Sequence, residues 1–253
     1  MSDLLPREII VLLERADLLE RDGALLKSRV RVARIHDRLI IHSAYPSVDP
    51  EAVFFSPETY RFSDFVRGEL VRVGRFSRLV DIGAGAGGGS ISAAPLLPGA
   101  RLTLCDVNPV ALRIARINAR HAGPEVETVE GGIEEVRGAF DIAIANPPYM
   151  IDEESRTYRD GGDMHGGRTS LEWALAAAER LSPGGRLFLY TASTIVDGQD
   201  ELREALGREV RGMGCSLRYR EIEPDIYGEE LEKAAYADVE RIAAIGVVVE
   251  KPQ

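Results

Sequence analysis

The spacing of apolar residues changes near Ser77, which divides the chain into two parts. In the first part, residues 4–19 place apolar side chains at intervals that suit one face of a helix. Two alternating stretches, Arg29–Ile35 and Arg38–His42, predict a hairpin. A second helix is expected from about Glu58 to Val73, after a loop that contains three prolines.

After Ser77, strand-like and helix-like segments alternate regularly. The expected strands are Arg78–Ile82, Arg101–Val107, Val126–Val129, Phe140–Ala145, Arg186–Thr191, Cys215–Glu221 and Ile242–Val249. The expected helices follow the glycine-rich turn Gly83–Gly89 and cover Pro109–Ala122, Thr169–Leu181 and Gln199–Met213, with short turns near Ile133–Val136 and Glu229–Tyr236. This alternation predicts an α/β fold, with a mostly parallel sheet covered by helices on both faces. The last two strands are joined without a long crossover helix, and they predict an antiparallel edge pair.

The length of 253 residues suits one α/β domain with a small appendage. We expect residues 1–56 to form an N-terminal helix and hairpin extension, either a substrate-binding region or a lid, and residues 57–253 to form the main domain. Hydrophobic residues make up 45% of the chain, so a core forms without help from a metal or a disulfide.

Charge and targeting signals narrow the range of partners and compartments. The formal net charge is −10, which disfavours free nucleic acid as a partner but leaves room for a local basic patch. No apolar run approaches the length of a membrane span, and acidic residues within the first 19 positions argue against a signal peptide. Cys105 and Cys215 lie in strand-like runs and are expected to be small buried residues. A cytoplasmic location is predicted.

The glycine-rich turn after the first strand of the second part is a candidate cofactor loop. Glycines there let the backbone turn tightly and approach a ligand. Asp106 ends the next strand, where a carboxylate can accept hydrogen bonds from both ribose hydroxyls of an adenosine.

Two cofactor classes fit this loop. Gly83, Gly85 and Gly88 satisfy the G-x-G-x-x-G pattern of nicotinamide-binding folds. Asp81 favours S-adenosyl-L-methionine instead, because an acid before the glycines repels a pyrophosphate but can hold the ammonium group of a methionine moiety. A nicotinamide oxidoreductase and a non-catalytic cofactor-binding module remain alternatives at this point.

The segment Asn146-Pro147-Pro148-Tyr149 directly follows the strand Phe140–Ala145, at the edge where open α/β sheets bind ligands. A planar nitrogen conjugated to a carbonyl or a ring is a weak nucleophile. The side-chain carbonyl of Asn146 and the backbone carbonyl of Pro147 can accept its N–H groups, orient it and favour positive charge on it. Tyr149 can stack on the planar group. These three residues are the predicted catalytic residues of an N-methyltransferase.

The pattern Asp81-x-Gly83-x-Gly85-x-Gly87, together with Asp106, resembles the first two motifs of Rossmann-like (class I) methyltransferases, and the resemblance extends from about Phe62 to Val249. It implies a seven-stranded, mostly parallel sheet with an antiparallel edge strand, and S-adenosyl-L-methionine as the cofactor. Where many relatives have Gly-Asp to contact adenine, this chain has Gly131-Gly132, so the Ile133 backbone or Glu134 is expected to serve. The expected cofactor-binding residues are Asp81, Gly83, Ala84, Gly85, Gly87, Asp106, Val107, Ile133 and Asn146.

The Asn-Pro-Pro-Tyr motif resembles those of adenine-N6 DNA methyltransferases, guanine-N2 ribosomal RNA methyltransferases and the glutamine-N5 methyltransferases of release factors. The last group matches best, because Phe55–Thr59, Arg159–Gly162 and Leu181–Leu187 are similar to segments around its motif. Its N-terminal helical bundle is longer than the extension here, and Ser56 stands where it has an arginine. The resemblance implies methylation of a protein glutamine. Methylation of an extruded nucleic-acid base or of a small molecule remains the alternative.

Two further segments are candidates for substrate contacts. The polar, glycine-rich stretch Tyr158–Arg168 follows the motif and is expected to be a lid or a surface connection. The stretch Pro224–Glu230 lies between the last two strands, where its acidic residues either face a basic ligand or are solvated.

Overall fold

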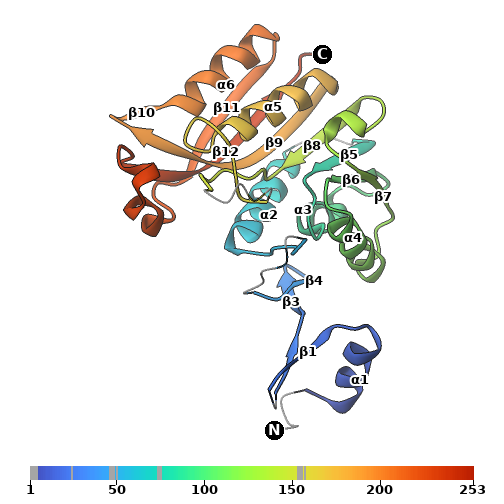
Figure 1. Cartoon of the computed structure of the whole chain (residues 1–253). Helices are drawn as coiled ribbons and strands as arrows, with labels where there is room; N and C mark the ends of the chain where they lie inside the picture. The colour runs from blue at the N-terminus through green and yellow to red at the C-terminus, as the bar shows by residue number, and fades with distance from the viewer. Residues whose placement is uncertain are drawn as a thin grey trace.

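The computed structural model describes residues 5–23, 25–45, 49, 51–72, 76–152, 156 and 158–253 of the chain. Figure 1 shows a large twisted sheet flanked by helices, with the N-terminal segments extending away from it. The helices and strands are, in chain order, α1 (Arg7–Arg15), β1 (Leu19–Asp22), β2 (Leu25–Ser28), β3 (Val30–Ile35), β4 (Arg38–Ser43), α2 (Pro57–Leu70), β5 (Arg78–Ile82), α3 (Gly88–Ala93), η1 (Ala94–Leu96), β6 (Arg101–Asp106), α4 (Pro109–Ala122), β7 (Val126–Glu130), η2 (Ile133–Glu135), β8 (Phe140–Ala145), α5 (Arg168–Arg180), β9 (Leu181–Val196), β10 (Gln199–Asp200), α6 (Glu201–Gly212), β11 (Ser216–Glu223), η3 (Gly228–Glu232), η4 (Ala234–Tyr236) and β12 (Arg241–Glu250).

The main sheet has the strand order β11-β12-β9-β8-β5-β6-β7, and the short strand β10 pairs with β9. The five strands β9, β8, β5, β6 and β7 run parallel to one another. β12 pairs antiparallel with both β9 and β11. The α/β fold class and the antiparallel edge pair are therefore confirmed, and the strand that runs against the others is β12, the inner member of that pair.

The apolar run Phe140–Ala145 forms β8, a central strand that is buried on both faces. Its alternate residues enter two different cores: Ile142 and Ile144 pack in the cluster that includes α2 residues, whereas Ala143 and Ala145 pack in the cluster that includes α5 and α6 residues. This division explains why the strand is apolar throughout. Figure 1 shows α5 and α6 on one face of the sheet and α2, α3 and α4 on the other.

The prediction of one helix over residues 4–19 is wrong beyond Arg15 (Leu4 lies outside the described residues). Asp17 has a left-handed backbone with a φ of 55°, and the Leu18 N–H bonds back to the Leu13 carbonyl at 2.9 Å. This C-terminal turn ends α1. The chain then forms the β1–β2 hairpin, which the sequence analysis missed because four-residue strands carry too little alternation to be distinguished from a continuing helix.

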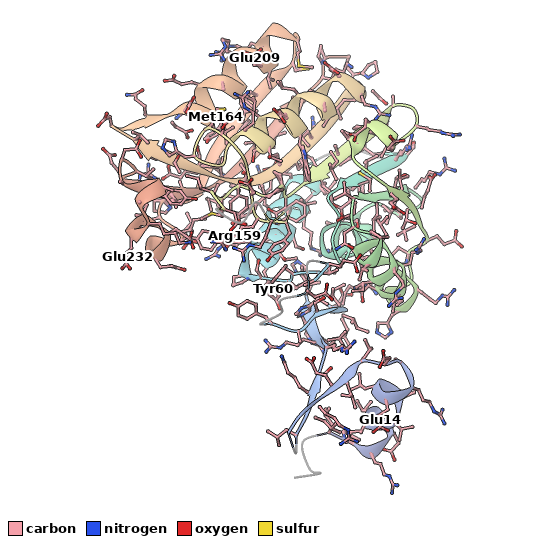
Figure 2. All side chains as sticks on the ribbon, viewed as in Figure 1. Glu14, Tyr60, Arg159, Met164, Glu209 and Glu232 are labelled. Atoms are coloured by element: carbon pink, nitrogen blue, oxygen red, sulfur yellow. The ribbon has the colours of Figure 1, made fainter. Side chains whose placement is uncertain are left out.

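The β3–β4 hairpin, which was predicted, packs against the main domain. Ile35 and Ile40 are buried in a cluster with α3 and α4 residues. Asn118 of α4 accepts the Ile41 N–H at 2.8 Å and donates to the carbonyls of Ile41 and Ala86, both at 2.9 Å. By contrast, α1 has no buried residue, and Figure 1 shows α1 and β1 standing away from the sheet. In Figure 2, Glu14 marks this outlying part.

Several element boundaries differ from the predicted ones, including those of β9, α6 and α2. β9 begins at Leu181 rather than at Arg186, because Leu181 pairs with Phe140 of β8. The Ser-Pro-Gly-Gly segment forms the register shift between this pair and the next one, Ile142 with Arg186. α6 begins at Glu201, after Asp200 accepts the Arg203 N–H as a helix cap. α2 ends at Leu70, and Val73, the predicted end, lies outside the described residues. The start of α2 at Pro57 coincides with the predicted division between residues 56 and 57; the division into two domains itself stays a prediction.

Candidate active site

The glycine-rich turn between β5 and α3 provides an open approach for a ligand at the carboxyl edge of the sheet. Gly83, Gly85 and Gly87 all have positive φ angles, of 65°, 54° and 79°. A Cβ atom at Gly83 would lie 2.6 Å from the Trp173 ring, so this glycine is needed for packing. A Cβ atom at Gly85 would meet nothing within 4 Å. Gly85 is thus the point where the backbone turns toward open space.

Asp106 ends β6 beside this turn, as the sequence analysis expected. One of its carboxylate oxygens accepts the Gly85 N–H and the other accepts the Asn108 N–H, both at 2.8 Å. Each oxygen keeps a further lone pair, which is what two ribose hydroxyls require. Burial raises the pKa of Asp106 despite these two bonds. The next residue, Val107, is 59% exposed and offers an apolar surface at the same edge.

Asp81 lies at the other side of the turn and is 1% exposed. Its carboxylate accepts the backbone N–H of Ser90 at 3.1 Å, near the start of α3. Burial raises the pKa of Asp81 to about 7, and the neighbouring Asp106 carboxylate contributes in the same direction. Asp81 therefore supports the turn from within, and the contact with a cofactor ammonium group stays a prediction.

The segment after β7, where adenine recognition was expected, is partly committed to the core. Ile133 is buried, and its carbonyl oxygen accepts a hydrogen bond from Arg180. Glu134 is exposed, and its carboxylate folds back over Gly132, where a Cβ atom would lie 2.3 Å from a carboxylate oxygen. The assignment of either residue to adenine stays a prediction.

The Asn-Pro-Pro-Tyr segment follows β8 at the same edge of the sheet. The side-chain carbonyl oxygen Oδ1 of Asn146 is buried and has no hydrogen-bond partner. A buried acceptor without a partner carries a free-energy cost that a donor from a ligand would remove. A hydrogen bond from a substrate N–H group to this atom stays a prediction.

Tyr149, the last residue of the motif, takes part in a hydrogen-bonded cluster that joins distant segments. Its hydroxyl lies 3.3 Å from that of Tyr227, and the two ring centroids are 6.4 Å apart. Tyr190 of β9 donates its hydroxyl to the buried carboxylate of Glu58, which also accepts from Arg61 at 2.6 Å. Burial is the main cause that raises the pKa of Tyr149 well above its ordinary value. The phenol therefore stays protonated at any physiological pH.

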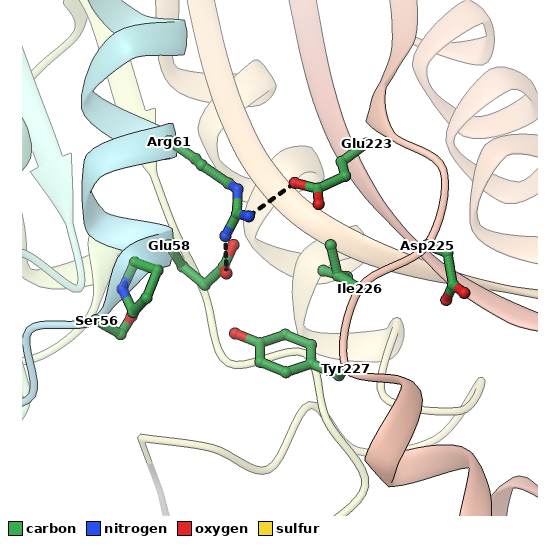
Figure 3. A pocket seen from close by; sticks show the side chains of 8 residues that line it. Ser56, Glu58, Arg61, Glu223, Asp225, Ile226 and Tyr227 are labelled. Carbon is green, nitrogen blue, oxygen red and sulfur yellow. Dashed lines mark hydrogen bonds and ion pairs between the residues drawn. The ribbon is translucent and has the colours of Figure 1, made fainter.

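A cavity of about 410 Å³ opens next to this cluster, between the first turn of α2 and the connection from β11 to η3. Figure 3 shows Arg61 between the carboxylates of Glu58 and Glu223, with Tyr227 and Ile226 on the opposite wall. The Arg61–Glu223 distance is 2.8 Å. Because Tyr227 lines the cavity and also touches Tyr149, the cavity adjoins the predicted catalytic motif.

The contacts within this cluster were not predicted from the sequence. In the sequence, Glu58 stands at the start of a predicted helix and in a segment similar to that of release-factor methyltransferases. Tyr227 lies in a stretch of candidate substrate contacts, and Tyr190 lies in a predicted strand. One signal was available: a phenol stands in the otherwise apolar run Leu187–Tyr190, and a fully buried tyrosine usually has a hydrogen-bond partner. The identity of that partner depends on the tertiary structure.

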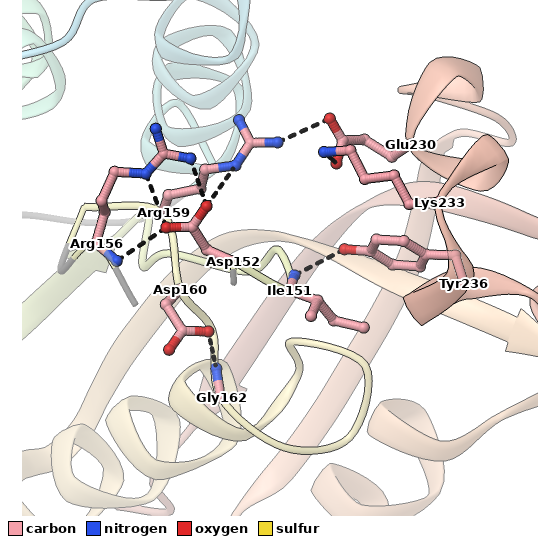
Figure 4. Close-up of polar contacts among 9 residues, drawn as sticks. All are labelled: Ile151, Asp152, Arg156, Arg159, Asp160, Gly162, Glu230, Lys233 and Tyr236. Carbon is pink, nitrogen blue, oxygen red and sulfur yellow. Dashed lines mark hydrogen bonds and ion pairs between the residues drawn. The ribbon is translucent and has the colours of Figure 1, made fainter. Parts of the chain in front are cut away.

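The chain that follows the motif is held by a charged network (Figure 4). Asp152 accepts bidentate hydrogen bonds from Arg156, at 2.8 and 2.5 Å, and lies 3.5 Å from Arg159. Arg159 in turn bonds Glu230 of η3 at 2.7 Å. The hydrogen bonds from Arg156 are the main cause that lowers the pKa of Asp152 to about 2.

The network continues to the segment between β11 and β12. Glu230 also accepts from Lys233 at 2.5 Å, and the Tyr236 hydroxyl accepts the backbone N–H of Ile151 at 2.7 Å. Both candidate segments of the sequence analysis are thus joined to each other. In Figure 2, Arg159 lies near the centre of the main body.

The predicted lid Tyr158–Arg168 packs directly on the motif backbone. The Gly161 N–H bonds the Met150 carbonyl at 2.8 Å, and a Cβ atom at Gly161 would lie 2.7 Å from the Tyr149 Cα. Close backbone contact of this kind requires glycine. This segment therefore covers the motif, and we call it the glycine cover. The Nε2 atom of His165 lies 3.2 Å from a carboxylate oxygen of Asp238.

The matches to known families agree with this architecture. The family described as methyltransferase small domain matches residues 65–211, more than half of the chain. The chain belongs to this family, and its fold is that of a class I, Rossmann-like methyltransferase.

Several characterised relatives carry methyltransferase names. The release factor glutamine methyltransferase of Deinococcus radiodurans is 31% identical over 193 residues, which cover 72% of this chain and 66% of the relative. That of Geobacter sulfurreducens is 31% identical over 137 residues, 49% of this chain and 48% of the relative. The ribosomal RNA small subunit methyltransferase C of Shigella flexneri is 33% identical over 135 residues, 51% of this chain and 35% of the relative. The chain thus spans less than two thirds of the length of these relatives.

Solved structures support the fold. The tRNA m1G37 methyltransferase of M. jannaschii superposes with a TM-score of 0.60 at 14% identity, covering 90% of this chain and 60% of that one. A SAM-dependent methyltransferase of Agrobacterium tumefaciens gives 0.58 at 15% identity, covering 99% and 80%. The family and the open turn at Gly85 beside Asp106 assign S-adenosyl-L-methionine as the cofactor. Within the described residues, no helix is long and apolar enough to cross a membrane.

Proposed function

We propose that this protein transfers the methyl group of S-adenosyl-L-methionine to the side-chain amide nitrogen of a glutamine in a protein. The observation that carries the proposal is the buried, unpartnered Oδ1 of Asn146 at the carboxyl end of β8. The side-chain NH₂ group of a glutamine substrate would supply the hydrogen-bond donor that this oxygen lacks.

The proposed division of roles follows from the geometry. Gly85, Asp106 and Val107 hold the cofactor at the ends of β5 and β6. Asn146 and the carbonyl of Pro147 accept the two amide hydrogens, so that the nitrogen lone pair is directed at the methyl carbon. When the bond from the methyl carbon to the nitrogen forms and the bond from carbon to sulfur breaks, S-adenosyl-L-homocysteine would be released and these two acceptors would favour the positive charge on the nitrogen. The nitrogen would then lose one proton to solvent to give the neutral N-methyl amide.

Tyr149 supplies the flat surface on which the amide plane lies. Its hydroxyl is tied to Tyr227, and the glycine cover at Gly161 fixes its backbone. An aromatic ring held at both ends loses little entropy when the acceptor arrives. This preorganisation suits an extended side chain such as glutamine.

The names of the relatives favour a protein as the methyl acceptor and also indicate one alternative acceptor. Two of the relatives described above are named for release factor glutamine methylation, whereas a third is named for ribosomal RNA. A base of ribosomal RNA is therefore the second candidate acceptor. The two cysteines are free and buried, which agrees with a reducing, cytoplasmic setting for the proposed reaction.

The test is methyl transfer from labelled cofactor to a purified bacterial class I release factor, and in parallel to small ribosomal subunits. We expect label on the release factor, a mass gain of one methyl on one glutamine, and no label when that glutamine is changed to glutamate. Labelling of the ribosomal RNA alone would replace the proposal with the second candidate. Labelling of neither acceptor, with intact cofactor binding, would refute both acceptors.

A further inference from the structure

One exposed face of α4 carries three arginines and no acidic residue. Arg113, Arg116 and Arg120 recur at intervals of three and four along this helix and are all exposed. This spacing places them in one row. The helix lies at the flank of the sheet that ends at β7 (Figure 1).

These side chains lack the partners that many other arginines have. In the part of the chain that the structure describes, no carboxylate oxygen lies within 4.0 Å of any of the three guanidinium groups. Arg116 donates to the Thr128 hydroxyl at 3.0 Å, and among the described residues this is the one side-chain hydrogen bond that the row makes. Arg61, Arg159 and Arg218, by contrast, each bind one or more carboxylates.

The buried packing of α4 does not depend on these arginines. The opposite face of α4 provides the packing, through buried Leu112 and Ala115, and Asn118 anchors the β3–β4 hairpin. Like charges at adjacent positions of a helix face destabilise it by a few tenths of a kcal/mol per pair. In a chain with a net charge of −10, a row of unpaired cations calls for an explanation outside the fold.

The row also frames a hollow. A cavity of about 330 Å³ is lined by the three arginines and by Ile117, which is 50% exposed. The hollow therefore combines an apolar side chain with three cationic ones. A surface of this kind accommodates a flat apolar group that carries an anion next to it.

We propose that this α4 arginine face (Arg113, Arg116, Ile117 and Arg120) binds the backbone of single-stranded RNA, with one base over Ile117. Guanidinium groups bind phosphate in a bidentate manner and stack on bases, which compact ammonium groups do not do. Arg113 and Arg120 are seven residues apart, or about 10 Å along the helix axis. Their flexible side chains reach phosphates of neighbouring nucleotides over that span. An acidic polypeptide would use the charges but not the apolar hollow.

The acidic character of the whole chain does not prevent this contact. At physiological salt the screening length is about 8 Å, so the charges next to a bound phosphate outweigh those on distant faces. Binding is expected to be weak and strongly dependent on salt. The face shares no residue with the proposed methyl-transfer site, so it stands or falls independently of the proposed function.

The test uses a fluorescent 12-nucleotide single-stranded RNA of mixed sequence, titrated with the full-length protein at several salt concentrations. The test variant changes Arg113, Arg116 and Arg120 together to serine. The matched control changes Arg203, Arg208 and Arg211 of α6 to serine, which removes the same charge from another exposed helix that also carries glutamates. A single Arg113→Glu variant serves if the triple variant folds poorly.

We expect micromolar binding at 50 mM salt, with a slope of log affinity against log salt of about −2 for three phosphate contacts to a single strand. The α4 triple variant should bind at least tenfold more weakly, and the α6 variant within twofold of the unchanged protein. Methyl transfer to the protein acceptor should be unchanged in both. Equal losses in both variants, no binding at all, or equally effective competition by polyglutamate would overturn the RNA assignment.

Discussion

The hydroxyl oxygens of Tyr149 and Tyr227 lie 3.3 Å apart, although 78 positions of sequence separate the two residues. Tyr149 belongs to the motif after β8, and Tyr227 caps η3 with a left-handed backbone, at a φ of 57°. A non-glycine residue in this conformation carries strain that its surroundings must offset. The contact thus connects the predicted acceptor site to the segment between β11 and β12.

Changing Tyr227 to phenylalanine should lower kcat roughly tenfold, or about 1.4 kcal/mol in the barrier, because Tyr149 loses the hydrogen bond that orients its ring. Cofactor affinity should stay within twofold, since the cofactor residues lie on β5 and β6. Steady-state kinetics with the unmethylated acceptor protein as the varied substrate measures kcat and KM. Tyr219→Phe is the control, because it removes another tyrosine–acceptor bond, to Asp200 at 2.7 Å, away from the motif. Equal effects of the two changes would mean that the contact serves stability alone.

Asn146→Ala should abolish most turnover, by a factor of about 100 or more, while the affinity for S-adenosyl-L-methionine changes only a few-fold. The reason is that Oδ1 of Asn146 is proposed to bind the acceptor amide. Asp106→Ala should instead weaken the binding of S-adenosyl-L-methionine, because it removes the proposed ribose contact. Calorimetric titration and single-turnover kinetics separate the two. Loss of both turnover and cofactor affinity in the Asn146 variant would contradict the division of roles.

Cofactor binding near pH 6.5 should release up to about one proton from Asp81. Its pKa is raised to about 7 in the folded protein, so the carboxyl is largely protonated there before binding. An ammonium group nearby favours the ionised form. The binding enthalpy should then differ between phosphate and imidazole buffers, and Asp81→Asn should remove the difference. An enthalpy independent of the buffer would exclude the proposed ammonium contact.

The same raised pKa has a consequence for stability without cofactor. A carboxyl whose pKa rises on folding favours the folded state less as pH increases from its unfolded pKa, near 4, to about 7. The free energy of unfolding of the unchanged protein should therefore fall over this range relative to that of Asp81→Asn. Urea unfolding at pH 5 and pH 8 measures the difference, which is expected to be at most a few kcal/mol.

Asp152→Asn should lower the free energy of unfolding at pH 7 by about 1–3 kcal/mol, because Arg156 and Arg159 lose a buried anionic partner. The folded-state pKa of Asp152 is lowered to about 2, so its contribution is present above pH 4 and is lost as pH falls toward 2. The two proteins should converge in stability at that pH. Asp163→Asn is the control, because Asp163 is an exposed residue of the nearby segment Tyr158–Arg168, and it should have no measurable effect on stability. A constant difference between pH 7 and pH 2 would contradict the charged network.

The sequence by itself determined most of the local elements after Ser77 and their order along the chain. Pro109–Ala122 and Phe140–Ala145 were predicted with the observed limits, because a proline at the first helical position and a strand buried on both faces leave local marks. The glycine turn, Asp106 and the Asn-Pro-Pro-Tyr segment were placed together at the carboxyl edge, since the ends of parallel strands meet there. These marks arise from the chain's own backbone geometry and apolar periodicity.

Only the tertiary structure decided which distant side chains meet. Glu58, Tyr149, Tyr190 and Tyr227 come from four separate segments, and no spacing in the sequence relates them. The same holds for Arg159, which contacts both Asp152 and Glu230. It also holds for Asn118, whose side chain bonds the β3–β4 hairpin at Ile41, much earlier in the chain. Hydrogen bonds and ion pairs are directional and require two partners. Each pairing depends on the packing that brings the segments together, whereas apolar burial follows from a residue's own chemistry and position.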